Sequence, residues 1–533
     1  MTSPSQLDPT PPSPVRTPER LSAPDRTKRA LMLLGLTLVL PGAAQVVAGD
    51  RRLGRLALRV TLTVWALLVL GVLLALFFNR PLLWLASNTV VQLVAVVVLA
   101  ALAVGWLILW VDTFRIIHWN LLAPGMKRVV GALTVGLMLL TGGVLGYGSY
   151  AVNTARNSLG TIFAVRPAID PVDGRYNFLV MGGDAGEGRE GLRPDSIHVA
   201  SIDADSGQVV MFSIPRNMQN APFTEDSPLW QVYPDGYSCG DACIINALYM
   251  DVTNQHAGLY PGAADPGAEA MKDAAGGILG LEIQGYALVD MDGFAQLIDA
   301  MGGVSVTTGG YTPYRGVRPD GQWGNVWWAP GEYTFNGADA LGYARSRLHT
   351  NDYARIARQQ CVQSAMLAQF NPQTLLTRFE GIMRAGEQIV ETDLPGQQLG
   401  TFVSLAAQSR SHPMERMTIG PPDFAGDRFT TFPDYELIHS RVDQKLAESA
   451  QAAASAGPYG PQALPLLIRF AQLPAASTPS ATPGTPQSEW PAPPTQPDGS
   501  PITPEYLQWA EDTGQVGLLE QAAATNHLCA PGR

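Results

Sequence analysis

The residues with the clearest chemistry lie in the segment LGYARSRLHTNDYARIARQQ, 341–360, which gathers positive charge in a chain of formal net charge −11. Its four arginines are Arg345, Arg347, Arg355 and Arg358, and Gln359 follows the last of them. The segment has no lysine, and arginine is preferred where a planar fork must grip phosphate or carboxylate. The alternative is a solvated basic surface with Asp352 as its local partner. The choice of arginine favours compact recognition of an anion.

The spacing of these residues places them on shared faces. In an extended GYARSR segment, Arg345 and Arg347 project from one face because side chains alternate along a strand. In a helix that follows, Arg355 lies one turn from both Arg358 and Gln359. We therefore expect a strand end and a helix start to direct several guanidinium groups at one small volume.

Three other stretches place charged residues near expected strand ends, the usual place for functional groups in open α/β sheets. These residues are Asp184 in NFLVMGGD, Arg193 and Asp195 in RPDS, and Arg216 in SIPRN. Each alone is weak, because an aspartate after glycine is most often a turn residue. Carboxylates beside phosphate-binding arginines suit a hydrated Mg²⁺, or Mn²⁺, that takes phosphate oxygens as further ligands. The set predicts a metal-associated phosphate site.

The elements that must position these residues alternate between strands and helices from about residue 170 to residue 447. Runs rich in β-branched residues predict strands at 176–184, 197–204 and 209–216. Apolar residues at helical spacing predict helices at 245–252, 267–280, 291–303 and 353–370. This alternation indicates an α/β sandwich with a central mixed sheet. The net charge argues against a nucleic-acid binder with a broad basic face.

Three runs without charge, 60–78, 88–111 and 129–150, are each close to the roughly 20 apolar residues that cross a bilayer as a helix. A fourth run, 31–48, is interrupted by PGAAQ. Basic residues flank both ends of this fourth run and fill the loop before residue 129, and such residues favour the cytoplasmic side. We therefore expect 31–48 to dip in and return, and the domain after residue 150 to lie outside the cytoplasm. If 31–48 crosses, that domain faces the cytoplasm instead.

Composition divides the rest of the chain. Pro, Ser and Thr dominate the N-terminal tail and a late linker, and such segments cannot bury a core. The expected parts are a disordered cytoplasmic tail (1–28), a membrane region (29–151), a stalk (152–170), an extracytoplasmic α/β domain (171–447), a linker (448–503) and a short C-terminal segment (504–533).

The four cysteines are Cys239, Cys243, Cys361 and Cys529. CGDAC has no second ligand pair at zinc-finger spacing, so a local disulfide between Cys239 and Cys243 is expected in an extracytoplasmic domain. Cys361 can be a buried thiol or pair with Cys529. The sequence leaves both open.

The ordered motifs NFLVMGGD, RPDSIHVASID, VVMFSIPRN, INALY, GYARSR and DYARIARQQ resemble the LytR-CpsA-Psr (LCP) family of membrane-anchored cell-wall enzymes over roughly 171–447. The resemblance implies an α/β/α fold that binds a polyprenyl pyrophosphate, with the prenyl tail in a hydrophobic tunnel. It implies transfer of an undecaprenyl-pyrophosphate-linked glycopolymer to peptidoglycan through a phosphodiester, with release of a polyprenyl phosphate. A polyprenyl-phosphate binding or regulatory module, or a pyrophosphate hydrolase with the same site, are the alternatives.

The resemblance also implies roles for single residues. Asp184 and Asp195 match the family's Mg²⁺-associated aspartates. The pyrophosphate-binding set is Arg193, Arg216, Arg345, Arg347, Arg355 and Gln359, and the residues expected to act in catalysis are Arg345, Arg347, Arg193, Asp195 and Asp352. Asn217 departs from the family, which usually has aspartate there, and Gly183 replaces a hydroxyl residue.

Four points stay open in the sequence. The transferred polymer is not specified, and Asp352 and Asp195 are both candidates for the general base. The aromatic loop 311–328 suits either stacking on sugar rings or hairpin packing. The apolar segments 270–300 and 361–379 can line the lipid tunnel or belong to the core.

Overall fold

The computed structural model describes residues 15–77, 88–162, 166–183, 192–318, 321–369, 390–410, 412–421, 423–424, 429–456 and 490–532. The chain divides into two compact units, Met1–Asn157 and Ser158–Arg533. Each is described by itself below.

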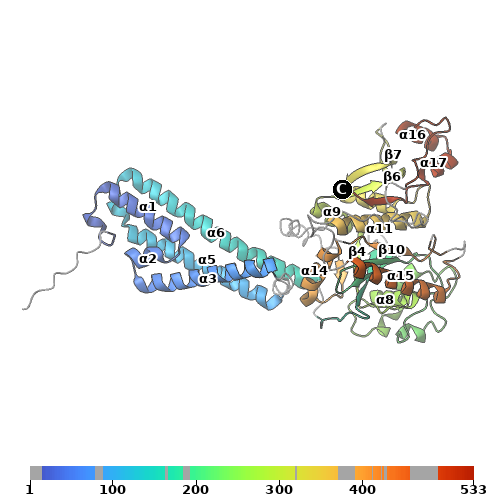
Figure 1. Ribbon diagram of the computed structural model, residues 1–533, viewed down its shortest axis with the longest axis horizontal. Helices are drawn as coiled ribbons and strands as arrows, with labels where there is room; N and C mark the ends of the chain where they lie inside the picture. The colour runs from blue at the N-terminus through green and yellow to red at the C-terminus, as the bar shows by residue number, and fades with distance from the viewer. Residues whose placement is uncertain are drawn as a thin grey trace, which may run out of the picture. The chain divides into compact units, whose positions relative to one another are not determined.

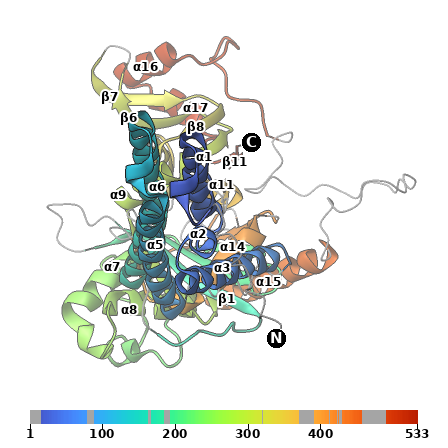
Figure 2. The same cartoon turned by 90° about the vertical axis from the view of Figure 1, so that its left-hand side faces the viewer.

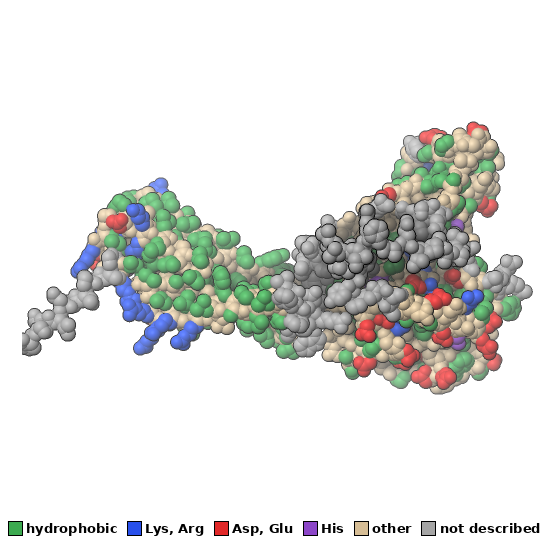
Figure 3. Space-filling view, viewed as in Figure 1, with side chains coloured by type: hydrophobic (Ala, Val, Ile, Leu, Met, Phe, Trp, Pro, Cys, Tyr) green, Lys and Arg blue, Asp and Glu red, His purple; other side chains and the backbone are tan. Residues whose placement is uncertain are grey.

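The first unit is a bundle of helices that run side by side (Figures 1 and 2). Its α-helices are α1 (Ala23–Val39), α2 (Ala43–Ala48), α3 (Arg51–Phe77), α5 (Thr89–Ile117) and α6 (Pro124–Ile162). Three stretches of them are long and apolar enough to cross a membrane, namely Arg51–Leu74, Val90–Ile117 and Pro124–Asn157. Apolar side chains cover the visible surface of the bundle, and Lys and Arg side chains gather at one end of it (Figure 3). This distribution is typical of a membrane anchor.

The interrupted apolar run forms a helical hairpin in which α1 and α2 are joined by a turn at Gly42, whose φ is 99°. The start and the end of this hairpin lie close together. Arg29 in α1 donates to the Val15 carbonyl, and Arg16 donates to the Val47 carbonyl at the end of α2. The hairpin therefore returns to the end of the unit where it began. Its place relative to a bilayer stays a prediction.

The second unit is built on a six-stranded mixed sheet with the order β10-β3-β2-β1-β4-β9. The strands are β1 (Arg175–Gly183), β2 (Pro194–Asp203), β3 (Val209–Ser213), β4 (Gly285–Asp290), β9 (Val390–Thr392) and β10 (Glu415–Thr418). β1 pairs antiparallel with β2 and parallel with β4. This mixed sheet confirms the predicted fold class.

Helices cover both faces of this sheet. Side chains alternate along its strands, so each strand sends residues into both layers. Leu179 and Met181 of β1 face a core that includes α7 (Ile245–Asp251), α8 (Pro266–Leu279) and α15 (Tyr435–Ala456). Tyr176 and Phe178 face the opposite layer, where α14 (Leu399–Ser409) packs through Phe402 and Leu405. α11 (Asp352–Gln369) also lies in this opposite layer.

A three-stranded sheet, β11-β5-β8, lies on the other side of α11 (Figure 1). Its strands are β5 (Val304–Thr308), β8 (Gly331–Phe335) and β11 (Cys529–Pro531), and a separate hairpin consists of β6 (Thr312–Val317) and β7 (Trp323–Trp328). The helices of this region are α9 (Met291–Met301), α10 (Gly337–Arg345), α16 (Pro504–Asp512) and α17 (Val516–Ala523). α11 is thus enclosed between two sheets, which fixes the helix that carries Arg355.

The prediction of an extended GYARSR segment is wrong. Arg345 is the last residue of α10, and the chain becomes extended at Ser346. Asn336 caps the start of α10 by accepting from the Asp339 amide. The spacing of two arginines is a weak signal for a strand. The N-terminal cap of α10 and its packing on α9 favour a helix up to Arg345.

Candidate functional site

The candidate site forms where the ends of β2 and β3 meet the start of α11. Asp195 is the second residue of β2, and Arg216 follows β3, its antiparallel neighbour in the sheet. Asp352 and Arg355 lie in the first turn of α11, and Arg347 lies in the short loop between α10 and α11. Segments distant in sequence therefore bring these five predicted residues together.

Two aspartates link the three arginines. Arg216 Nη1 lies 2.6 Å from Asp195 Oδ1, and its Nε lies 3.8 Å from Asp352 Oδ1. Arg355 Nη2 donates to Asp352 Oδ2 at 2.9 Å and to the Asp195 carbonyl at 2.9 Å. Arg347 Nη1 lies 3.9 Å from Asp352 Oδ1. Three guanidiniums against two carboxylates leave an excess of positive charge, which suits an anionic ligand.

Burial and charge set the protonation of this cluster. Burial alone would raise the pKa of Asp195, but the hydrogen bond and charge of Arg216, with the charges of Arg355 and Arg347, hold it below its usual value. Burial lowers the pKa of Arg355, while Asp352 opposes that shift. Asp195 is therefore anionic at neutral pH. The Arg347 side chain is 50% exposed and that of Asp195 is 44% exposed, so the cluster opens to solvent.

Two buried polar atoms beside this cluster lack a hydrogen-bond partner among the described residues. They are Arg355 Nε, a donor, and Gln359 Oε1, an acceptor. Buried polar groups in folded proteins are almost always paired, so an unpaired one is expected to meet water, an ion or a ligand. A phosphate oxygen would accept a hydrogen bond from the unpaired Nε donor of Arg355.

The other predicted site residues lie beside the cluster in sequence. Arg193 is exposed two residues before Asp195, and Arg345 is exposed two residues before Arg347. Arg193 lies near Tyr237. Burial raises the pKa of Tyr237, and the positive charge of Arg193 partly opposes that shift. Asp184, a predicted metal ligand, lies outside the described residues.

Arg358 does not join the cluster of Arg216, Arg347 and Arg355, contrary to the expectation that one helix face presents it with Arg355. Arg358 is fully buried. It donates to the carbonyl of Tyr343 at 3.0 Å, to Asn526 Oδ1 at 2.7 Å and to the Ser346 carbonyl. Its guanidinium is satisfied by backbone and amide oxygens, so its role is to hold the chain on either side of α10's end.

His198 is a site residue that sequence reasoning missed. It lies on β2, almost fully buried, with Nε2 2.7 Å from Ser196 Oγ and Nδ1 2.6 Å from Ser213 Oγ. Burial, helped by the charge of Arg355, lowers its pKa to about 4. The imidazole is therefore neutral at physiological pH, and its hydrogen bond to Ser213 joins β2 to β3. The only signal in the sequence was a histidine two residues after a serine within a strand.

The donor set is compatible with the Mg²⁺ that the family resemblance implies. Mg²⁺ is commonly held by one or two carboxylates together with water and phosphate oxygens. Asp195 offers one such carboxylate, because Arg216 contacts its Oδ1 and its side chain is half exposed. Among the described residues, no group of three or more His, Cys, Asp or Glu side chains could hold a metal. The metal therefore stays a prediction that rests on Asp195 and Asp184.

An apolar cavity of about 260 Å³ lies between the large sheet and helices α11 and α14. Its lining residues are Phe178, Ala200, Ile202, Val209, Met211, Gln363, Leu367, Leu394, Phe402, Leu405, Ala406, Ser409 and Met414. Of the two segments considered for a lipid tunnel, 361–379 contributes Gln363 and Leu367, and its residues from 370 on lie outside the described ranges. Residues 270–279 of the other segment, 270–300, belong to α8, which packs in the core on the opposite face of the sheet.

One face of α11 connects the arginine cluster to this cavity. Arg355, Gln359, Gln363 and Leu367 follow one another at intervals of four, which places them along one side of a helix. On β2, Ser196 and His198 precede Ala200 and Ile202 on the same face of the strand. The arginine cluster and the apolar cavity thus share two elements, α11 and β2, which suits one amphiphilic ligand.

The remaining candidates are the cysteines and the aromatic loop. Disulfides join Cys239 to Cys243 and Cys361 to Cys529. In the loop, Trp328 is buried and stacks on Tyr314 with ring centroids 3.6 Å apart, which is hairpin packing. Trp323, by contrast, is 71% exposed.

Comparisons with known proteins identify the family of this chain. Residues 149–447 match the model of the LytR_cpsA_psr family. The polyisoprenyl-teichoic acid–peptidoglycan teichoic acid transferase TagU of Halalkalibacterium halodurans is 26% identical over 50% of this chain and 81% of that protein. TagV of Bacillus subtilis, a transferase of the same description, is 24% identical over 50% of this chain and 64% of that protein. The crystal structure of B. subtilis TagV matches 52% of this chain and 98% of that chain, at 21% identity and a TM-score of 0.36. Because the family model covers more than half of its length, the chain belongs to the LytR_cpsA_psr family.

Proposed function

We propose that the protein is a membrane-anchored phosphotransferase that attaches a glycopolymer, linked to a polyprenyl pyrophosphate, to peptidoglycan. The observation that carries this proposal is the arrangement of Arg216, Arg347 and Arg355 around two aspartates, next to an apolar cavity on the same face of α11. The arginines suit the pyrophosphate and the cavity suits the prenyl chain. The relatives named as teichoic acid transferases support the same reaction class.

In this reaction, the acceptor hydroxyl oxygen of peptidoglycan bonds to the sugar-linked phosphorus. The bond from that phosphorus to the bridging oxygen breaks, and polyprenyl phosphate leaves with the bridging oxygen. The hydroxyl proton passes to a base, and Asp352 and Asp195 are the carboxylates at hand. Negative charge spreads over the phosphoryl oxygens in such transfers, so positioning and charge stabilisation supply most of the acceleration.

Each arginine of the cluster has a distinct part in that stabilisation. Arg355 is fixed by Asp352 and by the Asp195 carbonyl, so its unpaired Nε is held in place before the ligand arrives. Arg216 is fixed by Asp195. Arg347 is the most exposed of the three and closes on the pyrophosphate from the solvent side. Mg²⁺ held by Asp195 and Asp184 would add Lewis-acid stabilisation of the phosphate oxygens.

The proposed location of the domain is outside the cytoplasm. Three candidate spans and a basic end on the first unit support a multi-pass anchor. Two disulfides in the second unit support an oxidising compartment, because disulfides are rare in the cytosol.

The test uses the full chain in detergent with Mg²⁺, a polyprenyl-pyrophosphate-linked oligosaccharide and peptidoglycan fragments, with products identified by mass spectrometry. A phosphodiester-linked adduct is expected, and Arg347→Ala is expected to lower its rate by roughly 10²-fold or more. Arg315→Ala is the matched control, because Arg315 is an exposed arginine on β6. Release of sugar phosphate without adduct would identify a hydrolase, and bound lipid without turnover would identify a binding module. Either outcome would overturn the transferase.

A further inference from the structure

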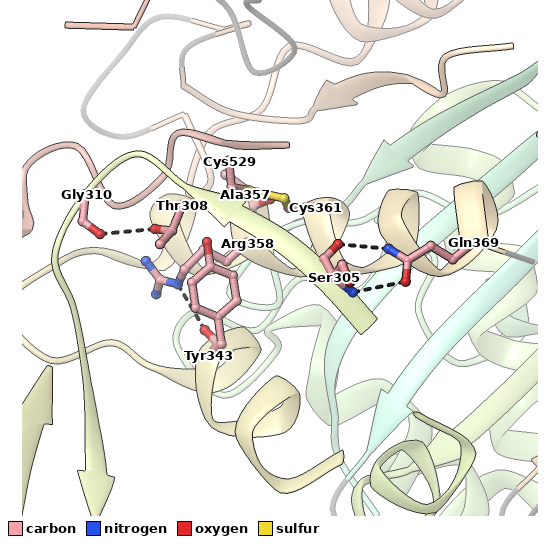
Figure 4. The surroundings of a disulfide bond; sticks show 9 residues. All are labelled: Ser305, Thr308, Gly310, Tyr343, Ala357, Arg358, Cys361, Gln369 and Cys529. Atoms are coloured by element: carbon pink, nitrogen blue, oxygen red, sulfur yellow. Dashed lines mark hydrogen bonds between the residues drawn. A yellow bond between two sulfur atoms is a disulfide. The ribbon is translucent and has the colours of Figure 1, made fainter. Parts of the chain in front are cut away.

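The C-terminal segment 490–532 lies outside the part of the chain that matches the family, yet it is integrated into the region around α11. β11 pairs antiparallel with β5, with Cys529 opposite Thr308. A disulfide joins Cys529 to Cys361 of α11 (Figure 4). The helix that carries Arg355 is therefore covalently attached to the end of the chain.

Two glycines allow this close approach. A Cβ on Gly310 would overlap the backbone of Thr525 and Asn526, and a Cβ on Gly309 would clash with Trp490 at 2.8 Å and with Leu528 at 2.9 Å. The Gly309 amide donates to the Leu528 carbonyl at 2.7 Å. The C-terminal chain thus lies directly on the segment that leads into the β6–β7 hairpin.

The loop 346–351, which carries Arg347, is held at its first residue through Arg358. Arg358 donates to the Ser346 carbonyl and the Tyr343 carbonyl, and Figure 4 shows its guanidinium beside the Tyr343 ring. Its remaining bond goes to Asn526 of the C-terminal segment, at 2.7 Å. Asn526 is fully buried. The amide of Asn526 therefore orients the guanidinium that fixes the loop.

A second contact holds the loop two residues beyond Arg347. His349 Nε2 lies 3.1 Å from Glu511 Oε1 of α16, and its ring stacks on Trp327. Glu511 Oε2 also accepts from Asn325 of β7. His349 has a φ of 53°, a left-handed conformation that is unfavourable for residues other than glycine. Such a conformation persists only where surrounding contacts determine it.

We propose that the C-terminal segment sets the position of the loop that presents Arg347, with Asn526 and Glu511 as positioning residues. The part that concerns catalysis rests on the proposed function, in which Arg347 binds the pyrophosphate. Neither residue touches the ligand. Both act on Arg347 through the backbone on either side of it.

The first arm of the test measures the loop itself and needs no substrate. Hydrogen exchange of the amides in 345–351 is followed in the full chain in detergent, for Glu511→Ala and for Asn526→Ala. Faster exchange in this loop is expected for both variants. Asp512→Ala is the matched control, because Asp512 is the next residue of α16 and pairs with Arg318 of the hairpin instead. Unchanged exchange in Glu511→Ala, or equal acceleration in Asp512→Ala, would overturn the proposal.

The second arm measures transfer with the polyprenyl-pyrophosphate oligosaccharide. Glu511→Ala is expected to lower kcat/KM by roughly tenfold, since small displacements of a positioning group are costly in rate. Glu511→Gln and Asn526→Asp keep an acceptor oxygen and are expected to restore most of the rate. In an Arg347→Ala background, Glu511→Ala is expected to change kcat/KM by less than about twofold, because both changes act through one side chain. Additive losses would show a merely structural role. Absence of turnover in the unsubstituted chain would refute the proposed function and leave the exchange result valid.

Discussion

At the scale of residues, the site combines fixed charge with unfilled hydrogen-bonding capacity. Arg355 is only 3% exposed, and its two partners engage Nη2, while Nε has no partner among the described residues. Removing one member of a buried charge pair generally costs about 3–5 kcal/mol, so such a group persists only where its neighbours compensate it. Asp352 supplies that compensation without saturating the guanidinium. The residual donor is what a phosphate ligand requires.

His198 leads to a prediction about pH. Its pKa in the folded protein is about 4, because it is buried and lies near Arg355, whereas an unfolded histidine has a pKa near 6.5. Between these values the unfolded state binds the extra proton, so stability must fall as pH falls through this window and be fully present above about pH 6.5. From pH 7 to pH 5 the loss from this group is about 2 kcal/mol.

The measurement compares thermal denaturation of the full chain and of His198→Gln at pH 7 and pH 5. Glutamine can still bond to Ser196 and Ser213 but does not titrate. We expect a smaller drop in Tm for the variant between the two pH values. Equal drops would show that His198 is protonated in both states or in neither.

At the scale of elements, β2, β3 and α11, which place Asp195, Arg216 and Arg355, follow largely from hydrophobic periodicity, although β2 begins three residues before the expected strand and β3 ends three residues before Arg216. β2, β3 and α11 lie close to the ranges expected from the sequence. The buried role of Arg358 could not be predicted, because its partner Asn526 is 168 residues away and no local pattern connects them. His198 was missed for a similar reason, since Ser213 faces it only through the β2–β3 register. Local patterns determine elements, and long-range contacts decide which polar residues they enclose.

The start of α10 gives a prediction at this scale. A Cβ on Gly337 would overlap the Ala295 backbone of α9, whereas a Cβ on Gly342 would meet its nearest neighbour, Trp328, at 3.5 Å. Gly337→Ala is therefore expected to destabilise the protein by about 1–3 kcal/mol through overpacking. Gly342→Ala is expected to be neutral or stabilising by up to about 1 kcal/mol, because alanine favours a helix interior over glycine. Tm values of the two variants test this, and a milder effect at Gly337 would contradict the close packing of α9 and α10.

At the scale of the whole molecule, the first unit determines on which side of a membrane the site works. Arg26 donates to the Leu121 carbonyl and Arg29 to the Ile116 carbonyl, so the start of α1 and the end of α5 share one end of that unit. The contacts of Arg16 with Val47 place the end of α2 there as well. α3 and α6 therefore begin at this basic end, and the end of α6 lies away from it. Since Lys and Arg favour the cytoplasmic side, the end of α6 is expected on the opposite side.

Reporter fusions test this orientation. A reporter that is active only in the cytoplasm is expected to work when fused in the α5–α6 loop at Ala123, and to be inactive when fused after Asn157. If the α1–α2 hairpin crossed the membrane, both results would be reversed. Neutralising Arg51, Arg52, Arg55 and Arg59 to alanine is expected to give mixed signals at both positions, because these charges anchor the return of the hairpin. A cytoplasmic signal after Asn157 in the unsubstituted chain would place the arginine cluster on the side of the membrane where peptidoglycan is absent, and the proposed acceptor would then be wrong.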